Sequence, residues 1–204
     1  MSYQLSAILE GHTNDVRCVA AYPGDSLVSG SRDKSLKLWT SDGDGKCWTA
    51  QMNFEGHTSY VSCIAVMPPN DTYTDGLIYT GSNDNMIRAY VPHKTSPDHA
   101  LQGHSANVAS LYISKNQTLL STSWDTTARV WLNQKTVMTL KDHEAAVWCG
   151  VILSEVGLMV LKNLKKYFEY ILLYYFYFAY WYIGNWSSRR DVKSLEGWRL
   201  QGNC

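Results

Sequence analysis

Several features that would mark a specialised class of protein are missing from this sequence. Its 18 basic and 18 acidic residues balance, so no excess charge favours nucleic acid or a membrane surface as a partner. The five cysteines are odd in number and scattered, without a CxxC pair or a metal-ligand spacing. The first residues lack the basic and apolar regions of a secretory signal. We therefore expect a reducing, intracellular setting and no metal or other cofactor.

Internal repetition is the strongest signal that the sequence does contain. Gly-His pairs end at His12, His57 and His104, and a degenerate Asp-His pair ends at His143. These histidines are 45, 47 and 39 residues apart, which is the length of a four-stranded propeller blade. Each is followed by a short apolar run of the kind that forms a buried strand. The repeat predicts an all-β propeller.

Three parallel segments follow the apolar runs, namely LVSGSRDKSLKLW, LIYTGSNDNMIRAY and LLSTSWDTTARVW. Each leads to Ser-x-Asp, with an aromatic residue six positions after the aspartate. The predicted sets, one per blade, are His12, Ser31, Asp33 and Trp39; His57, Ser82, Asp84 and Tyr90; and His104, Ser123, Asp125 and Trp131. We expect the aspartate to orient the histidine, and the serine hydroxyl to relay to the indole N–H, with a different ending at Tyr90. Such a buried polar chain is stable when every member is satisfied.

A hydrolase triad is the competing interpretation of histidine, serine and aspartate in one set. An active site occurs once, however, whereas this combination recurs three times at blade spacing. The sequence also has no G-x-S-x-G elbow. We therefore expect a structural role for the sets and a protein that is not an enzyme.

The segments SRDKSLKLW, GHTSYVSCIAVMP, STSWDTTARVWLN and MTLKDHEAAVW resemble the amino-terminal WD40 propeller of the phospholipase A-2-activating protein family. The resemblance runs almost continuously over residues 3–159. The family includes the fungal ubiquitin-homeostasis factor. It implies a seven-bladed propeller whose face binds ubiquitin, in an adaptor of ubiquitin-dependent degradation and ubiquitin recycling in the cytoplasm and nucleus. In the family, later domains bind ubiquitin and dock on the AAA segregase valosin-containing protein. We expect neither domain here, and we therefore expect segregase binding only of the full-length parent.

The repeat supports residues 1–159 as an incomplete propeller, with three full blades and part of a fourth. Residues 160–183 form an aberrant segment, in which positions 167–182 hold eleven aromatic residues and one acid. A membrane span is one alternative, although seven tyrosines suit an interface better than a bilayer centre. We interpret the segment as translated intron and residues 184–204 as exon read out of frame. Transcripts that skip the segment and restore the Asp-to-Trp repeat would support this interpretation, and abundant translated message that retains it would contradict it.

One end of each blade is predicted to face a partner. Three candidates come just before a first strand (Asp15, Tyr60 and Asn107), and three lie between Ser and Asp (Arg32, Asn83 and Trp124). Arg17, two positions after Asp15, is the seventh. Trp124 is the strongest of them, since its neighbours Ser123 and Asp125 are expected to point inward. Tyrosine, tryptophan and arginine are typical interface anchors. A generic WD40 scaffold and a membrane-tethered half-propeller remain the alternatives to ubiquitin binding.

Overall fold

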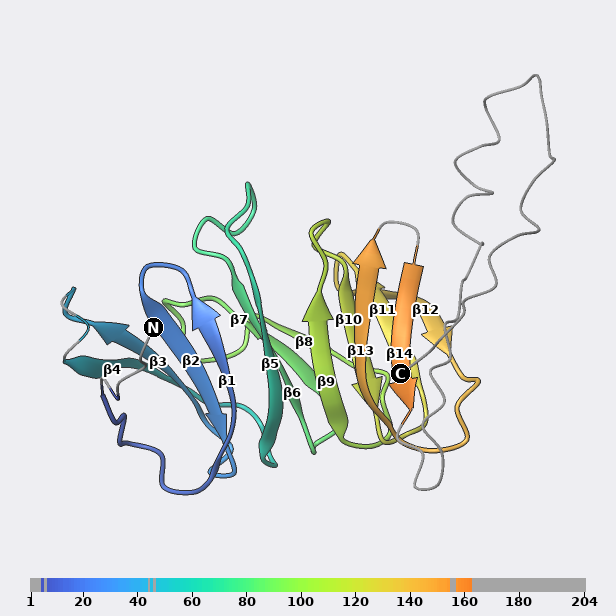
Figure 1. Cartoon of the computed structure of the whole chain (residues 1–204), viewed down its shortest axis with the longest axis horizontal. Helices are drawn as coiled ribbons and strands as arrows, with labels where there is room; N and C mark the ends of the chain where they lie inside the picture. Colours follow the sequence, from blue (N-terminus) through green and yellow to red (C-terminus); the bar gives the residue numbers. More distant parts are fainter. Residues whose placement is uncertain (1–4, 6, 44, 46, 155–156, 163–204) are drawn as a thin grey trace, which may run out of the picture.

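The computed structural model describes Leu5 and residues 7–43, 45, 47–154 and 157–162. Within these residues the chain forms β-strands and no helix. The strands make three four-stranded sheets and one two-stranded sheet, all antiparallel (Figure 1). Each sheet keeps its strands in chain order, so the sheets are four successive meanders, here named blades 1 to 4.

Blade 1 consists of β1 (Val16–Tyr22), β2 (Ser26–Ser31), β3 (Leu36–Ser41) and β4 (Trp48–Phe54). Blade 2 consists of β5 (Val61–Met67), β6 (Leu77–Ser82), β7 (Ile87–Tyr90) and β8 (His99–Leu101). Blade 3 consists of β9 (Val108–Ile113), β10 (Leu119–Ser123), β11 (Ala128–Leu132) and β12 (Lys135–Leu140). Blade 4 is the hairpin β13 (Val147–Ser154) and β14 (Gly157–Lys162).

The first strands of the four blades are neighbours in space: β1 contacts β5, β5 contacts β9, and β9 contacts β13 (Figure 1). This stacking confirms the prediction of a WD40-type propeller with three full blades and part of a fourth. The blades form an open row, because the described strands do not close a ring (Figure 1). No described helix is available to cross a membrane.

The expected boundary after Met159 falls inside β14, which continues to Lys162 and pairs there with Val147. Nearly all of the predicted aromatic segment and the whole of the predicted tail lie in residues 163–204, outside the described residues. The intron interpretation therefore stays a prediction.

The second strand of each full blade is the most enclosed. Every residue of β6 and β10 is buried, as are the last four residues of β2. Neighbouring blades cover both faces of β6 and β10, so the sequences of these two strands contain small and apolar residues without the alternation of a half-exposed strand. By contrast, β4 and β12 are largely exposed, because they form the outer edges of their blades.

The hydrophobic core is divided among the spaces between blades. One apolar cluster joins blades 1 and 2, a second joins blades 2 and 3, and a third joins blades 3 and 4. The exposed fraction of the valine that begins each first strand shows this packing directly. Val61, Val108 and Val147 are each 0% exposed, whereas Val16, at the same position in blade 1, is 55% exposed. Blade 1 therefore has an apolar face that no described residue covers.

The segment PPNDTYTDG lengthens the second repeat and forms a loop at residues 68–76, between β5 and β6, as predicted. The loop also bonds to blade 3. The Asn70 amide donates to Oε1 of Gln117 over 3.0 Å, and Nε2 of Gln134 donates to the Tyr73 hydroxyl over 3.1 Å. These bonds fasten blades 2 and 3 at the end opposite the Ser-x-Asp turns.

Candidate functional site

A histidine–aspartate pair joins two distant segments in each full blade. The distance between histidine Nδ1 and aspartate Oδ2 is 2.8 Å for His12–Asp33, 2.9 Å for His57–Asp84 and 2.8 Å for His104–Asp125. Each aspartate lies in the turn between the second and third strands, and each histidine lies before the first strand. The pair therefore fastens the entry segment of a blade to its central turn.

The hydroxyl that continues the relay is a different residue from the one that the sequence suggested. Nε2 of His12 lies 2.8 Å from Oγ of Ser29, not of Ser31, and Nε1 of Trp39 donates to that same oxygen over 2.8 Å. The corresponding hydroxyls in the other blades are Thr80, 2.8 Å from His57, and Ser121, 2.7 Å from His104. The assignments of Ser31, Ser82 and Ser123 to the relay were therefore wrong.

Strand register explains the correction. Trp39 pairs with Leu27 across β2 and β3, so Ser29 is two residues from the position opposite the indole and Ser31 is four residues from it. At about 3.3 Å of rise per residue, Ser31 begins roughly 13 Å away along the strand, beyond the reach of the indole N–H. Trp131 pairs with Leu119 in the same way, which selects Ser121 over Ser123.

The serines that begin Ser-x-Asp hold the turn instead. Each hydroxyl donates to a backbone carbonyl before the first strand: Ser31 to Asn14 over 3.0 Å, Ser82 to Ser59 over 3.2 Å and Ser123 to Ala106 over 3.1 Å. Each also accepts the N–H of the following aspartate over 3.1 Å. They position the aspartate that the histidine binds.

Donor and acceptor accounting assigns the protons of the relay. The Trp39 indole can only donate, so Ser29 Oγ accepts from it and gives its own hydrogen to Nε2 of His12. Nδ1 then carries the imidazole hydrogen and donates it to Asp33. The same order holds for Trp131, Ser121 and His104 in blade 3, and every member is satisfied with a neutral histidine.

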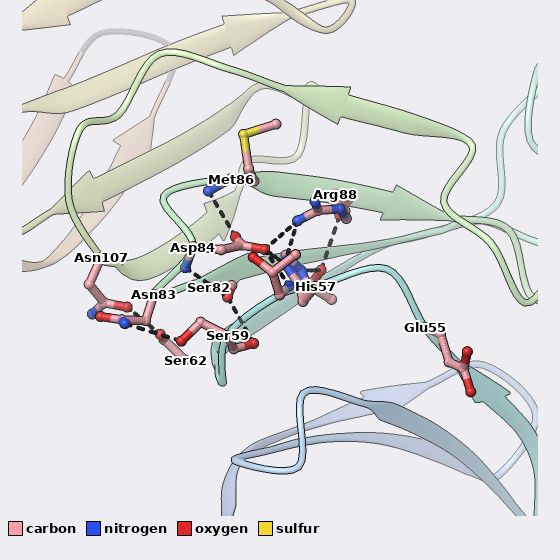
Figure 2. A network of polar contacts seen from close by, with 12 residues as sticks. Glu55, His57, Ser59, Ser62, Ser82, Asn83, Asp84, Met86, Arg88 and Asn107 are labelled. Atoms are coloured by element: carbon pink, nitrogen blue, oxygen red, sulfur yellow. Dashed lines mark hydrogen bonds and ion pairs between the residues drawn. The ribbon is translucent and has the colours of Figure 1, made fainter.

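Blade 2 ends its relay differently, as the tyrosine at position 90 predicted. The Tyr90 hydroxyl donates to the carbonyl of Glu55 over 3.2 Å, and burial raises the pKa of Tyr90 to about 12. A second difference lies at Met86, which occupies the position of Ser35 and has no hydroxyl for the aspartate. Arg88 replaces that hydroxyl, because its Nη1 lies 2.7 Å from Oδ2 of Asp84 (Figure 2).

The three aspartates are held as carboxylates. Burial by itself would raise the pKa of each, but the hydrogen bonds that each accepts outweigh that effect. Ser35, His12 and Thr13 thereby hold the pKa of Asp33 well below its usual range. His57 and Thr58 do the same for the pKa of Asp84, and the corresponding bonds lower the pKa of Asp125 to about 2.

Burial also lowers the pKa of His57 and His104, and it outweighs the opposing effect of their aspartate partners. Folded histidines and aspartates with lowered pKa values bind fewer protons than the unfolded chain does, so the free energy of unfolding rises with pH. Stability should therefore fall as pH drops below the ordinary histidine pKa of 6.5, and fall again below the ordinary aspartate pKa of 3.8.

Urea unfolding at pH 7.5, 6.0 and 5.0 measures the histidine part of this dependence. His57→Asn and His104→Asn should each flatten the pH profile above pH 5. If the free energy of unfolding instead rose as the pH was lowered from 7.5 to 5.0, the conclusion that His57 and His104 are neutral in the folded chain would be contradicted.

The relay hydroxyls are enclosed rather than presented to a substrate. Thr80 and Ser121 are 0% exposed, and Ser29 is buried beside Trp39. A nucleophile needs access to the bond that it attacks, so this arrangement suits a structural relay better than a hydrolase triad. The described part of the chain also contains no group of three or more His, Cys, Asp or Glu residues that could hold a metal.

The predicted partner-facing residues lie at the same end of each full blade. An equivalent backbone hydrogen bond recurs there in all three blades. The turn residue between Ser and Asp donates its N–H to the residue before the first strand: Arg32 to Asp15 over 2.8 Å, Asn83 to Tyr60 over 3.1 Å and Trp124 to Asn107 over 3.0 Å. This common end, formed by the entry segments and the Ser-x-Asp turns, is called the turn face below. A regular turn thus displays a different side chain in each blade.

Contacts on the turn face differ between blades. In blade 1, Arg32 and Asp15 form an exposed ion pair at 3.5 Å. Across the boundary to blade 2, the Arg17 guanidinium carbon lies 5.8 Å from the centre of the Tyr60 ring, as in a cation–π contact. The amide of Asn83 donates to the Ser59 hydroxyl over 3.1 Å, so this side chain also has a local role.

Asn107 does not fit the predicted partner-binding role. It is 5% exposed, and its side-chain oxygen accepts a hydrogen bond from the Ser62 hydroxyl of the preceding blade (Figure 2). Its position matches that of Tyr60, but a short side chain there is covered by the neighbouring blade. The hydrogen bond of Asn107 links blades 2 and 3, so its side chain is not available to contact a partner.

Trp124 points outward and is 39% exposed, while Ser123 beside it is fully buried. It packs against Trp148 of blade 4, with ring centres 5.3 Å apart and ring planes at 54°. Trp148 is 46% exposed and was not among the sequence candidates. The repeat pattern could have identified Trp148 as a candidate. It follows Val147, the first residue of β13, just as the candidate Arg17 follows Val16, the first residue of β1.

Comparisons with known proteins agree with this geometry. A model of the WD domain, G-beta repeat, family matches residues 3–40, 48–90 and 95–131. Phospholipase A-2-activating protein of Xenopus laevis is 45% identical over 159 residues, and the match covers 76% of this chain and 20% of that protein. Ubiquitin homeostasis protein lub1 of Schizosaccharomyces pombe is 34% identical, over 64% of this chain and 18% of that protein.

Among solved structures, the WD40 β-propeller domain of Doa1 superimposes with a TM-score of 0.67 and 32% identity. That match covers 77% of this chain and 51% of the solved chain. The chain thus spans about a fifth of the length of the curated relatives that it matches, and about half of the solved propeller. It belongs to the WD domain, G-beta repeat, family, and its repeats are those of a relative of phospholipase A-2-activating protein.

Proposed function

We propose that this chain is a ubiquitin-binding WD40 adaptor that acts in ubiquitin-dependent degradation and ubiquitin recycling, and that its turn face is the binding surface. The observation that carries the proposal is the near-continuous match to relatives of which one is named for ubiquitin homeostasis. The relay supports it physically, because three satisfied polar chains hold the turns of successive blades in one arrangement.

The chemistry of the turn face fits the binding of a protein. Large side chains with little conformational freedom, such as tryptophan and tyrosine, and arginine with its planar charge, dominate the binding energy of interfaces. Arg17, Arg32, Tyr60 and Trp124 supply these types from three adjacent blades. Their turns are rigid before binding, so little ordering of the backbone is required when a partner docks.

Capture of the purified chain on immobilised ubiquitin tests the proposal. The wild-type chain should be retained, and Trp124→Ala should weaken retention by roughly tenfold or more, because an exposed aromatic anchor is lost. Val137→Ala is the matched control, since Val137 is 52% exposed on the outer strand β12, away from the turn face. Its retention should equal that of the wild type.

Two results would redirect the proposal. A folded wild-type chain that ubiquitin does not retain would contradict ubiquitin binding and favour a WD40 scaffold for another protein. Equal losses with Trp124→Ala and Val137→Ala would contradict the turn face as the surface. Circular dichroism on each variant establishes that the comparison is between folded proteins.

A further inference from the structure

The contact between two successive blades, called a junction below, is made in the same way throughout the row. At each junction the first strand of one blade packs against the first and second strands of the blade before it. Blade 1 has no described blade before it and blade 4 has none after it, and they lie at opposite ends of the row (Figure 1). Each end therefore carries one half of a junction that the described residues do not complete.

The half-junction on blade 1 is apolar and open. Val16 is 55% exposed and Val19 is 66% exposed, and these two side chains define the open face of blade 1. The same two positions in blade 3 are Val108 and Leu111, which are 0% and 9% exposed because they pack in the cluster between blades 2 and 3. Blade 1 thus exposes apolar groups that the equivalent face of blade 3 buries, and such a surface favours association.

The half-junction on blade 4 contains a thiol at the position that receives the next valine. Between blades 2 and 3, Cys63 is buried, and its Sγ lies 3.4 Å from the carbonyl oxygen of Val108 in the next blade. Cys149 holds the same position in blade 4, two residues after the first valine of its strand, and it is exposed. We therefore expect Cys149 to lie beside the first valine of whichever blade packs on blade 4.

One position differs between the inner junctions and this end. Gly81 lies opposite the thiol in blade 2, whereas strand register gives that place to Leu161 in blade 4. Blade 3 shows that the junction accepts a larger residue there. Thr122 stands at the glycine position of blade 3, and Val147, the valine that packs on that blade, is still 0% exposed.

The length of the row indicates which molecule fits both half-junctions. The chain superimposes on 51% of a solved propeller, so the row corresponds to about half of a ring. A second copy supplies the other half, because its blade 1 can pack on blade 4 of the first copy and its blade 4 on blade 1 of the first copy. Two rows of four blades make eight blades, about the upper end of the range for propellers. Head-to-tail contacts between identical chains give a ring when the rotation from copy to copy closes.

We infer that the open face of blade 1 binds blade 4 of a second copy of this chain, so that two copies close one ring about a twofold axis. The inference goes beyond the proposed function, which concerns the turn face alone. Because the twofold axis coincides with the axis of the ring, the two turn faces lie at the same end of the pair. A partner with two binding sites would therefore meet both of them at once.

Sedimentation velocity of the purified chain over a range of concentrations tests the inference. The wild-type chain should change from one copy to two as its concentration rises, and should not grow further. Val19→Glu should weaken the association by roughly tenfold or more, because the junction would bury a carboxylate without a partner. Val137→Glu is the matched control and should associate like the wild type, since Val137 is a valine that is 52% exposed on the outer strand β12.

A disulfide between copies tests the predicted neighbours directly. By equivalence with Val108 and Cys63, position 16 of one copy should lie beside Cys149 of the other. Val16→Cys should therefore join two chains through Cys149 when oxidised glutathione is reduced to its two thiols, and peptide mass mapping identifies the linkage. Val137→Cys should not form a linkage to Cys149. This measurement also decides the case if Val19→Glu does not fold.

Four results would overturn the inference. A folded wild-type chain that remains a single copy at every concentration would contradict the association, and equal association of folded Val19→Glu and Val137→Glu would contradict the open face of blade 1 as its site. A disulfide that joins position 16 of both copies would contradict the head-to-tail order. Assemblies that grow beyond two copies would contradict ring closure, since a head-to-tail contact that does not close gives an open filament.

Discussion

Asp84→Ala is expected to lower the free energy of unfolding by about 3–5 kcal/mol, the loss typical when one partner of a buried ion pair is removed. The substitution deprives four groups of their acceptor at once: Nη1 of Arg88 at 2.7 Å, Nδ1 of His57 at 2.9 Å, and the backbone N–H groups of Thr58 and Met86. The side chain of His57 is 0% exposed and that of Arg88 is 14% exposed, so water compensates little. Urea unfolding of the purified chain measures the loss.

Blade 3 supplies the matched control for the role of Arg88. Arg129 occupies the same strand position, but there the Thr127 hydroxyl donates to Asp125 over 2.7 Å. Arg88→Ala should therefore destabilise more than Arg129→Ala, by about 1–2 kcal/mol, since it alone removes a charge-assisted hydrogen bond to the relay aspartate. Equal losses from the two substitutions would contradict this account.

A compensating substitution sharpens that comparison. Met86 holds the position of Thr127, so Met86→Thr should supply the missing hydroxyl to Asp84 and recover part of the stability lost in Arg88→Ala. The same threonine in the wild-type background should change stability little, because Arg88 already serves the carboxylate. This pattern is a double-mutant cycle between neighbouring sites.

Gly81→Ala should strongly destabilise the packing between blades 2 and 3. A Cβ at Gly81 would lie 2.5 Å from Cγ1 of Val108 and 2.6 Å from Sγ of Cys63, which is closer than such contacts occur. Overpacking of a core costs about 1–3 kcal/mol, and here both neighbours are themselves buried between blades 2 and 3. Thermal unfolding should show a lower midpoint or no folded chain.

The valine partner provides the control. Val108→Ala removes the nearest clashing carbon, so the double variant with Gly81→Ala should lose less stability than the sum of the two single losses. Val16→Ala should have a small effect, because Val16 holds the position of Val108 but is 55% exposed. A Gly81→Ala chain as stable as the wild type would show that the blades separate more easily than their packing indicates.

Much of the site could be predicted from spacing alone. Recurrent His12, Asp33 and Trp39 positions mark the blade and its relay, because residues at the same place in a repeat meet the same environment. The identity of the hydroxyl could not be predicted in this way. Ser29 and Ser31 both recur as hydroxyl residues, and register between β2 and β3 decides which one faces the indole.

Contacts between blades were the least predictable from sequence. Asn107 looked exposed by its equivalence to Tyr60, yet it is buried by its bond to Ser62 of the preceding blade. The pairing of Trp124 with Trp148 likewise joins residues from two repeats. A repeat pattern compares equivalent positions along the chain, whereas these contacts depend on which side chains adjacent blades bring together.

The sequence by itself determined the number and order of the full blades and the histidine–aspartate pairs, because each follows from the spacing of the repeats. It also determined the family, through segments such as STSWDTTARVWLN that resemble known members. Tertiary structure decided which hydroxyl completes each relay, how Arg88 replaces the hydroxyl absent at Met86, and which side chains of the turn face stay exposed. These features depend on strand register and on the stacking of one sheet against the next, and neither is encoded in the spacing of a single repeat.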